Sequence, residues 1–600
     1  MDTADEEQAE PGEAIEPEAI EPDEPDAVPG NEALHRRVDA AIVGWMDRVD
    51  ERRRALTAPV GDRVDRVWDR ATAPLLGPWT RWQTSTVLRQ KVPTWAAVVV
   101  AVGYLAVFVR LIWWRHERFG SFDYDLGMYD QGIWQLAHGR GFMTSRGMHV
   151  FAHHANLGYL LFVPFYWVGL GGPHFLNVVN ALAVVATAVP LFLLGRRHLR
   201  SSWAGFAFVV AYLFHFSPQW KIQETFHPES LAVAFLAAAW WFASIGRWRW
   251  YSLCILGALI WKEDVAIAVA VLGLAIALAH RAPLKGVATS AAGVVWFLAA
   301  TQLFMPAFQE SGAVFDGLFG QLGKDANEVV HTSLVHPSRL WETVQCHGVL
   351  DGRPRPAPVP IEGVDCPATL PTENLPPRGW LTLAQPYGVV PAVAAPHVAA
   401  VGAPQHVVNY ATTADFTWDL RWHYAFLPYL GVVLATVHWV VRRRRAVVSW
   451  AAIAVMLVGV GVTAELGIGP WTTNHDSGWW PLTERPGDEE VRALLGRIPD
   501  DAAVSASYFL VPHLSHREHI YTFPNPWRSS NFGVGGVPAP PDPNIVEYLV
   551  TRPGDLNDLD RAQWDAVVGS GQFERVRDVA GVELWRRVRD GDPPVPPPTP

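Results

Sequence analysis

Long apolar segments recur along most of the chain and are separated by shorter polar ones. Most of them approach the length that a helix needs to cross the hydrocarbon core of a bilayer. The pattern predicts nine membrane-spanning helices, at residues 95–114, 174–195, 203–217, 228–245, 250–261, 265–280, 285–307, 423–441 and 447–468. We therefore expect an α-helical polytopic membrane bundle.

Two further apolar runs, 157–170 and 381–403, are not counted as spans. Basic clusters occur at 36–91, 196–200, 247–249, 281–285 and 442–445. The positive-inside rule places all five in the cytoplasm, and this parity fails if either run crosses the membrane. We expect 157–170 to lie along the outer face. The prolines of 381–403 interrupt helical hydrogen bonding, so this run is predicted to form a re-entrant or surface hairpin.

The same parity predicts the orientation. The N-terminus is expected in the cytoplasm, and the plasma membrane is the expected location. The outer loops 115–173 and 308–422 and the C-terminal domain are expected outside the cytoplasm. No signal peptide opens the chain, so the first span is expected to serve as the targeting signal.

The two ends of the chain differ from the apolar middle. Residues 1–34 are predicted to form a disordered acidic tail, because 1–32 hold thirteen Asp or Glu and no Lys or Arg. Residues 35–93 form a basic amphipathic segment, either a helix on the cytoplasmic membrane surface or a self-associating helix. Residues 470–590 are predicted to be a small soluble α/β domain, and 591–600 a Pro-rich tail.

Within the C-terminal domain, charge patterning predicts a helix at 488–498. Strand composition is seen at 503–507 and 545–550, with further candidate strands at 564–568 and 582–585.

Composition changes this picture little. Half of the residues are hydrophobic, and the net charge of −11 lies largely in the acidic tail. Of the three cysteines, Cys254 lies in an apolar run. Cys346 and Cys366 share a polar loop and form a candidate disulfide if that loop faces an oxidising side.

The densest polar cluster follows the first span directly, in the stretch Phe122–Gln131. Asp123 and Asp125 are two residues apart, so in an extended segment both carboxylates face one side. They could bind a divalent cation such as Mg²⁺ or Mn²⁺, or take a proton from an acceptor hydroxyl. The alternative is a helix N-cap with surface carboxylates.

Three histidines follow in the same loop. His149, His153 and His154 could complete a metal site with Asp123 and Asp125. They could equally be hydrogen-bond donors at the membrane interface.

Two more polar clusters interrupt the apolar runs. In the stretch Glu224–Glu229, His227 precedes a predicted span and Glu229 opens it. Glu229 would lie at the positive end of that helix, where the helix dipole stabilises a carboxylate, and this explains the residue without a function. Lys262, Glu263 and Asp264 are costly in an apolar region unless they pair, line an aqueous cavity or bind a charged ligand.

Lys262 could hold a phosphate, with an ion pair to a neighbouring carboxylate as the alternative. Arg421 and His423, just before the span at 423, could contact an anionic headgroup. No P-loop or dinucleotide-binding glycine motif is present, so we expect no nucleotide cofactor, and nothing indicates a nucleic-acid partner.

Several separated motifs resemble a bacterial membrane family named only as domain of unknown function 2079. They are Phe122–Leu136, His153–Pro164, His227–Glu229, Lys262–Asp264, His423–Pro428 and Val511–Phe523. The resemblance covers roughly residues 95–585.

That family in turn resembles the GT-C superfamily of membrane glycosyltransferases, which place an acidic residue or pair in the first outer loop and take sugar from a polyprenyl-phosphate donor. The resemblance implies that Asp125, with Asp123, is the catalytic or metal-binding acid. It also implies that Lys262, and Arg421 with less support, contact the donor phosphate. The proline-interrupted run 381–403 and the Pro-rich insertion 351–379 depart from a simple outer loop.

Three functions remain open from the sequence. The first is a glycosyltransferase-like enzyme that transfers a sugar from a polyprenyl-phosphate donor to an acceptor outside the cytoplasm. The second is a transporter or lipid-handling protein, for which buried charges would also be used. The third is a non-catalytic envelope scaffold. The sequence gives no oligomeric state.

Overall fold

The computed structural model describes residues 87–309, 326–346, 379–412, 419–443, 445–466, 486–530 and 541–588, together with a few residues between these ranges and eight between Ala40 and Glu51. Met1–Ala55 and Leu56–Pro600 form two separate units. In the first unit, the described residues from Ala40 to Glu51 are helical, as the apolar spacing there predicts. The acidic tail 1–34 and the tail 591–600 lie outside the described residues.

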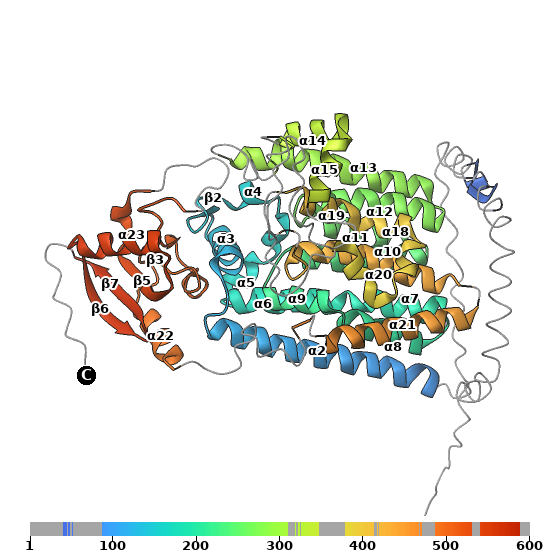
Figure 1. Ribbon diagram of the computed structural model, residues 1–600, viewed down its shortest axis with the longest axis horizontal. Coiled ribbons are helices and arrows are strands. Elements are labelled where there is room, and N and C mark those ends of the chain that lie inside the picture. The colour runs from blue at the N-terminus through green and yellow to red at the C-terminus, as the bar shows by residue number, and fades with distance from the viewer. Residues whose placement is uncertain are drawn as a thin grey trace, which may run out of the picture. The chain divides into compact units, whose positions relative to one another are not determined.

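Helices lie at all nine positions where spans are predicted (Figure 1). They are α2 (Val92–Glu117), α6 and α7 (Pro173–Ala186 and Ala188–His198), α8 (Ser202–Leu213), α10 (Glu229–Ser244), α11 (Trp248–Leu259), α12 (Val265–His280), α13 (Pro283–Ala299), α20 (Phe426–Val441) and α21 (Ala446–Glu465). Five of the described helical segments are long and apolar enough to cross a membrane, and several shorter apolar helices join them. The predicted polytopic helical bundle is confirmed.

Small residues allow α12 and α13 to pack closely. A Cβ on Gly273 of α12 would lie 2.4 Å from the carbonyl oxygen of Gly286, and one on Gly286 would lie 2.5 Å from that of Gly273. The two backbones can approach this closely only because both positions lack a side chain. α12 and α13 therefore form a tight antiparallel pair.

Contacts between loops show that the basic clusters gather at one end of the bundle. The indole of Trp203 donates to the carbonyl of Leu88, and His198 bonds Ser244. Lys285 lies over the ring of Trp248. Arg442 donates to the carbonyl of Ala279. We call this the basic end, and the helices alternate in direction as the parity argument predicts.

The two apolar runs that were not counted as spans are short and broken. Leu157–Leu161 is a 3-10 turn, and α5 covers only Val163–Trp167. Leu160, Leu161, Trp167 and Leu170 remain exposed, as expected for a segment lying along a membrane surface.

The second run forms a hairpin that enters the bundle. Its short helices are α16 (Gly379–Ala384), α17 (Val390–Val393), α18 (Pro396–Ala399) and α19 (Ala403–Ala411). His397 lies beside His438 near the basic end, and Asn409 donates to the carbonyl of Tyr424 at the start of α20. The return leg thus runs along α20 from the turn that precedes it to His438. The hairpin is re-entrant, and the surrounding helices cover its irregular backbone.

The loop after α2 folds over the other end of the bundle. It contains the short helical turn η2 (Asp123–Gly127), α3 (Met128–Ala137), the strand pair β1 (Phe142–Met143) and β2 (Met148–His149), and α4 (Val150–His153). Farther along are α14 (Ala326–Val335) and α15 (Pro337–Cys346). Cys366 and the side chain of Cys346 lie outside the described residues, so the disulfide stays a prediction. Cys254 is a buried free thiol.

The C-terminal part is a small α/β domain, as expected (Figure 1). Its sheet has the order β4-β3-β5-β7-β6. The strands are β3 (Val504–Ala506), β4 (Ile520–Thr522), β5 (Tyr548–Thr551), β6 (Phe573–Val579) and β7 (Val582–Arg587). β3 is parallel to both β4 and β5, whereas β7 is antiparallel to β5 and β6. Helix α22 (Asp488–Leu495) lies within the helix predicted at 488–498.

One strand prediction is wrong. Residues 564–568 lie in helix α23 (Asp558–Gly569) and not in a strand. The side chain of Asn557 accepts the amide of Asp560 and caps the helix, and Trp564 and Val567 are buried three residues apart on one face. A short apolar run is compatible with either a strand or a helix, and here the N-cap formed by Asn557 favours the helix.

Two of the resembling motifs contact each other across the domain boundary. Asp130 of α3 accepts hydrogen bonds from Ser515 (2.5 Å) and Tyr166 (2.6 Å), and His516 lies 3.0 Å from it. The amide of Ile520 donates to Thr144 at 2.9 Å. The motif Val511–Phe523 therefore holds the helix that directly follows Asp125.

Candidate functional site

Asp125 lies in η2, between α2 and α3, at the end of the bundle opposite the basic end. Its Oδ1 is 3.1 Å from Nε2 of His227, and its side chain is 22% exposed. Burial alone would raise the pKa of Asp125, but His227, His423 and Lys221 lower it to about 2. The carboxylate is therefore ionised at neutral pH and accessible from one side. Asp123 lies in the same turn, and its side chain is not described.

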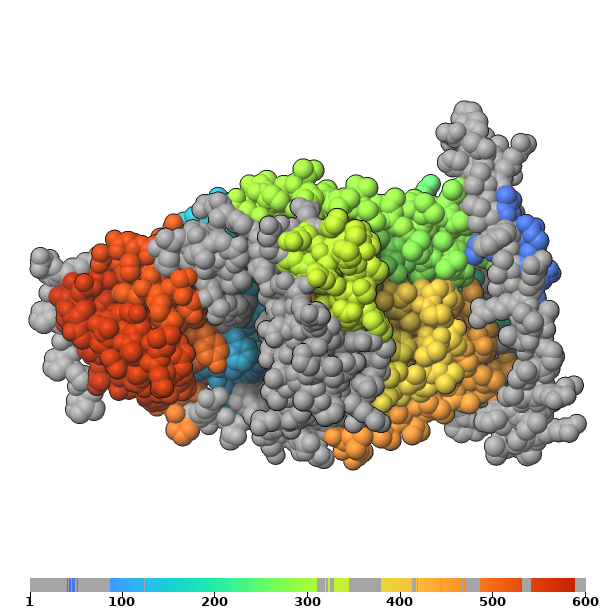
Figure 2. Space-filling model, turned by 45° about the horizontal axis from the view of Figure 1, so that its top comes forward, coloured from blue at the N-terminus to red at the C-terminus, as the bar shows by residue number. Residues whose placement is uncertain are grey.

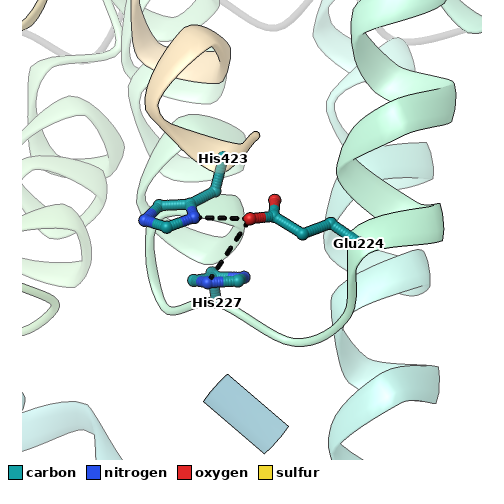
Figure 3. A group of neighbouring side chains, drawn as sticks. All are labelled: Glu224, His227 and His423. Carbon is teal, nitrogen blue, oxygen red and sulfur yellow. Dashed lines mark hydrogen bonds and ion pairs between the residues drawn. The ribbon is translucent and has the colours of Figure 1, made fainter. Parts of the chain in front are cut away.

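Three side chains converge beside Asp125 (Figure 3). Oε1 of Glu224 is 2.7 Å from Nδ1 of His423 and 3.8 Å from Nε2 of His227. The two imidazole rings stack with their centroids 3.7 Å apart. All three residues are buried, and among the described residues they are the one group whose ligand atoms are close enough to hold a metal ion.

The local chain path explains this convergence. Helix α9 (Phe216–Glu224) ends at Glu224, and Thr225 has a positive φ of 145° that turns the chain sharply. His227 follows, and Pro228 comes just before α10. His423 arrives from a 3-10 turn that leads into α20. Burial raises the pKa of Glu224 to about 7, although His227 and Lys221 act to lower it.

Lys262 is the centre of a second buried group. Its Nζ is 2.5 Å from Oε1 of Glu229 and 3.3 Å from Oδ2 of Asp264. Burial acts to lower the pKa of Lys262, but Asp264 and Glu229 raise it above its usual range. The two groups join at Glu229, which lies 3.9 Å from His423.

Glu263 belongs to a third contact. Its Oε1 is 2.8 Å from Nδ1 of His154, and its Oε2 accepts a hydrogen bond from the backbone amide of Ala155. His153 is buried beside His154, with ring centroids 4.3 Å apart. His149 caps α4 and stacks on Phe308, away from Asp125. The described geometry brings Asp125 to His227, whereas Glu263 holds His154.

Arg421 is already engaged by a carboxylate. Its guanidinium bonds both oxygens of Asp419, with the shortest contact 2.6 Å. Its predicted role at an anionic headgroup stays untested.

Sequence reasoning missed two buried cations. Nζ of Lys221 lies 3.9 Å from Oε2 of Glu224 and has no hydrogen-bond partner within the described part of the chain. Arg115 donates to the carbonyls of Gln223 and Glu224 and fixes the end of α9. The available signal was the spacing of Lys221 and Glu224, which puts both on one helix face.

The fold and these charged groups define a multi-pass membrane protein with a polar centre at one end of its helices. Residues 115–348 and 374–583 match the family described as "Predicted membrane protein (DUF2079)". The chain belongs to this family, which confirms the resemblance found in its motifs. No curated protein matches the chain.

Two solved structures are similar over long stretches. ArnT from Cupriavidus metallidurans, bound to undecaprenyl phosphate, is 12% identical, with 84% of this chain and 100% of that chain covered and a TM-score of 0.43. The oligosaccharyltransferase of Archaeoglobus fulgidus, tethered to an acceptor peptide, is 12% identical, with 76% and 69% covered and a TM-score of 0.34. Function is therefore argued from the residues of this chain.

Proposed function

We propose that this protein transfers a sugar from a polyprenyl-phosphate donor to an acceptor hydroxyl outside the cytoplasm. The observation that carries the proposal is the contact of Asp125 with His227, beside Glu224 and His423, at the end of the bundle opposite the basic loops. Figure 3 shows the side chains of Glu224, His227 and His423. Under the positive-inside rule this end faces outward, and the plasma membrane is the proposed location.

Asp125 is the proposed contact for the acceptor. It is the partly exposed member of a group whose other members are buried, so a hydroxyl can reach it. A carboxylate with a pKa near 2 is a weak base, which favours orienting the hydroxyl over removing its proton early. The proton passes to Asp125 as the oxygen bonds to the anomeric carbon and the bond from that carbon to the phosphate oxygen breaks.

The donor phosphate needs cations as its bond to the sugar breaks. Lys262 is held by Glu229 and Asp264, so phosphate binding there requires displacing one of them. Lys221 makes no such hydrogen bond and supports a phosphate contact beside Glu224. We therefore propose Lys221 together with Lys262 as the donor contacts, with polyprenyl phosphate as the leaving group.

The test uses purified full-length protein in detergent with radiolabelled polyprenyl-phosphate sugars. Sugar transfer or donor hydrolysis by the wild type, and its loss in Asp125→Asn, is the expected result. Asp555→Asn changes an exposed acid of the C-terminal domain and is the matched control. Full activity in Asp125→Asn would contradict the assignment.

A transporter is the second candidate, because the buried chain Asp264–Lys262–Glu229 is the kind of charge network that transport pathways use. Uptake or lipid flipping in liposomes without any sugar transfer would favour it.

A further inference from the structure

The group Glu224, His227 and His423 has the composition of a transition-metal site. It offers two imidazole nitrogens and a carboxylate oxygen, all within 4.8 Å of one another and all buried. Asp125 supplies a further oxygen, 3.1 Å from Nε2 of His227. Two nitrogens with two carboxylates suit Zn²⁺ and related ions, whereas Mg²⁺ and Ca²⁺ prefer oxygen ligands alone.

The distances fit a tetrahedral ion. Ligands about 2.0–2.1 Å from a tetrahedral metal lie roughly 3.3 Å from one another. Three of the separations among the four ligand atoms are 2.7, 3.1 and 3.8 Å, close to that value. Binding one ion would require Glu224 to move from His423 toward His227, and the stacked rings of His227 and His423 to rotate so that a nitrogen of each points at the ion.

The surrounding charges favour a cation. Within the described side chains, five carboxylates share this region with three basic side chains. The carboxylates are Asp125, Glu224, Glu229, Glu263 and Asp264, and the basic residues are Arg115, Lys221 and Lys262. A bound divalent cation would stabilise the ionised form of the carboxylates closest to it.

A second observation points to the same place. The side chain of His227 is wholly buried, and its Nε2 faces Asp125 and Glu224 without a well-aligned hydrogen bond. Oε2 of Glu224 is also buried, and none of the described residues forms a hydrogen bond with it. A purely structural network would be expected to satisfy both atoms.

We propose that Glu224, His227 and His423, together with Asp125, bind one Zn²⁺ or a similar divalent transition-metal ion. The ion would tie the loop after α2 to the α9–α10 turn and to the start of α20, three segments far apart in sequence. This site differs from the Asp123, Asp125, His153 and His154 set expected from the sequence, because Glu263 holds His154. It does not depend on sugar transfer.

The test is metal binding by full-length protein purified without a polyhistidine tag. After chelator treatment and desalting, Zn²⁺ is restored and counted by elemental analysis, and Co²⁺ is titrated as a visible-absorbing probe. We expect one equivalent per chain, intense absorption typical of tetrahedral Co²⁺, and a rise in Tm on adding Zn²⁺.

Variants locate the site. His423→Asn should weaken binding by more than about 100-fold, beyond the cost of losing an outer-shell partner. His423→Cys keeps a ligand and should add a sulfur-to-cobalt absorption band. His406→Asn, a buried histidine elsewhere, should bind as the wild type.

Three results would overturn the proposal: no Zn²⁺ or Co²⁺ bound by folded wild type, binding unchanged in His423→Asn, or no sulfur band in a folded His423→Cys protein. Failure of these binding tests would leave the proposed enzyme activity standing, because sugar transfer is measured separately.

Discussion

The buried carboxylate of Asp130 is predicted to hold the C-terminal domain against the loop that carries Asp125. Asp130 is fully buried. Its Oδ2 accepts a hydrogen bond from the hydroxyl of Ser515 and lies near His516. Its Oδ1 accepts a hydrogen bond from the hydroxyl of Tyr166. Replacing Asp130 by Ala removes all three interactions at once, so the domain should detach more often.

The expected cost follows from these contacts. A hydrogen bond to a charged group contributes about 1.5–3 kcal/mol to stability. We use this value unreduced for Ser515, because the residue is buried and water does not screen the interaction. The partly exposed His516 adds about 0.2–1 kcal/mol. A total near 3 kcal/mol corresponds to about a hundredfold increase in the detached population, at 1.4 kcal/mol per tenfold.

Hydrogen exchange measures this population directly. The amide of Ile520 donates to Thr144 across the boundary, so it exchanges when the domain opens. Its exchange should accelerate about a hundredfold in Asp130→Ala and by less in Asp130→Asn, which keeps one acceptor oxygen. Asp555→Asn should leave it unchanged.

The reasoning fails if Ile520 exchanges at the wild-type rate in Asp130→Ala. It also fails if Asp130→Asn opens the boundary more than Asp130→Ala, since charge and hydrogen bonding would then not explain the contact.

Three further changes have defined outcomes. Lys262→Met leaves the buried carboxylate of Glu229 without its closest cation and should destabilise the protein by about 3–5 kcal/mol, read as a lower Tm in detergent. Gly158→Ala places a Cβ 2.4 Å from the buried ring of Trp261 and should cost about 1–3 kcal/mol by the same measurement. Asp130 raises the pKa of His516 against the effect of burial, so the pair stabilises the folded protein below pH about 6.5 and this contribution is lost as pH rises through the raised pKa.

Each of these has a matched control. Adding Glu229→Gln to Lys262→Met should recover stability, and no recovery would contradict the ion-pair explanation. Gly103→Ala introduces a Cβ into open space and should be neutral; a loss equal to that of Gly158→Ala would refute the steric argument. In His516→Gln, the fall in Tm between pH 6 and pH 8 should be smaller than in the wild type, and an equal fall would refute the pH prediction.

Local information in the sequence was enough for the membrane architecture. Apolar length identified the helices, and the basic clusters gave their alternation, because both properties are set by how each segment meets lipid and water. The prolines of 381–403 likewise predicted a broken segment, since a proline removes a backbone donor wherever it stands. The run at 564–568 was misjudged because a few apolar residues fit a strand and a helix equally.

The composition of the site was decided by the tertiary structure. Asp125, His227, Glu229, Lys262 and His423 were all noticed as polar exceptions in apolar surroundings. The sequence could not pair them, because their contacts join segments up to about 200 residues apart. The sequence grouped Asp125 with histidines of the same loop, whereas the fold brings it to His227. Chain proximity is a poor guide once helices return to the same end of a bundle, and only their packing determines which buried charges meet.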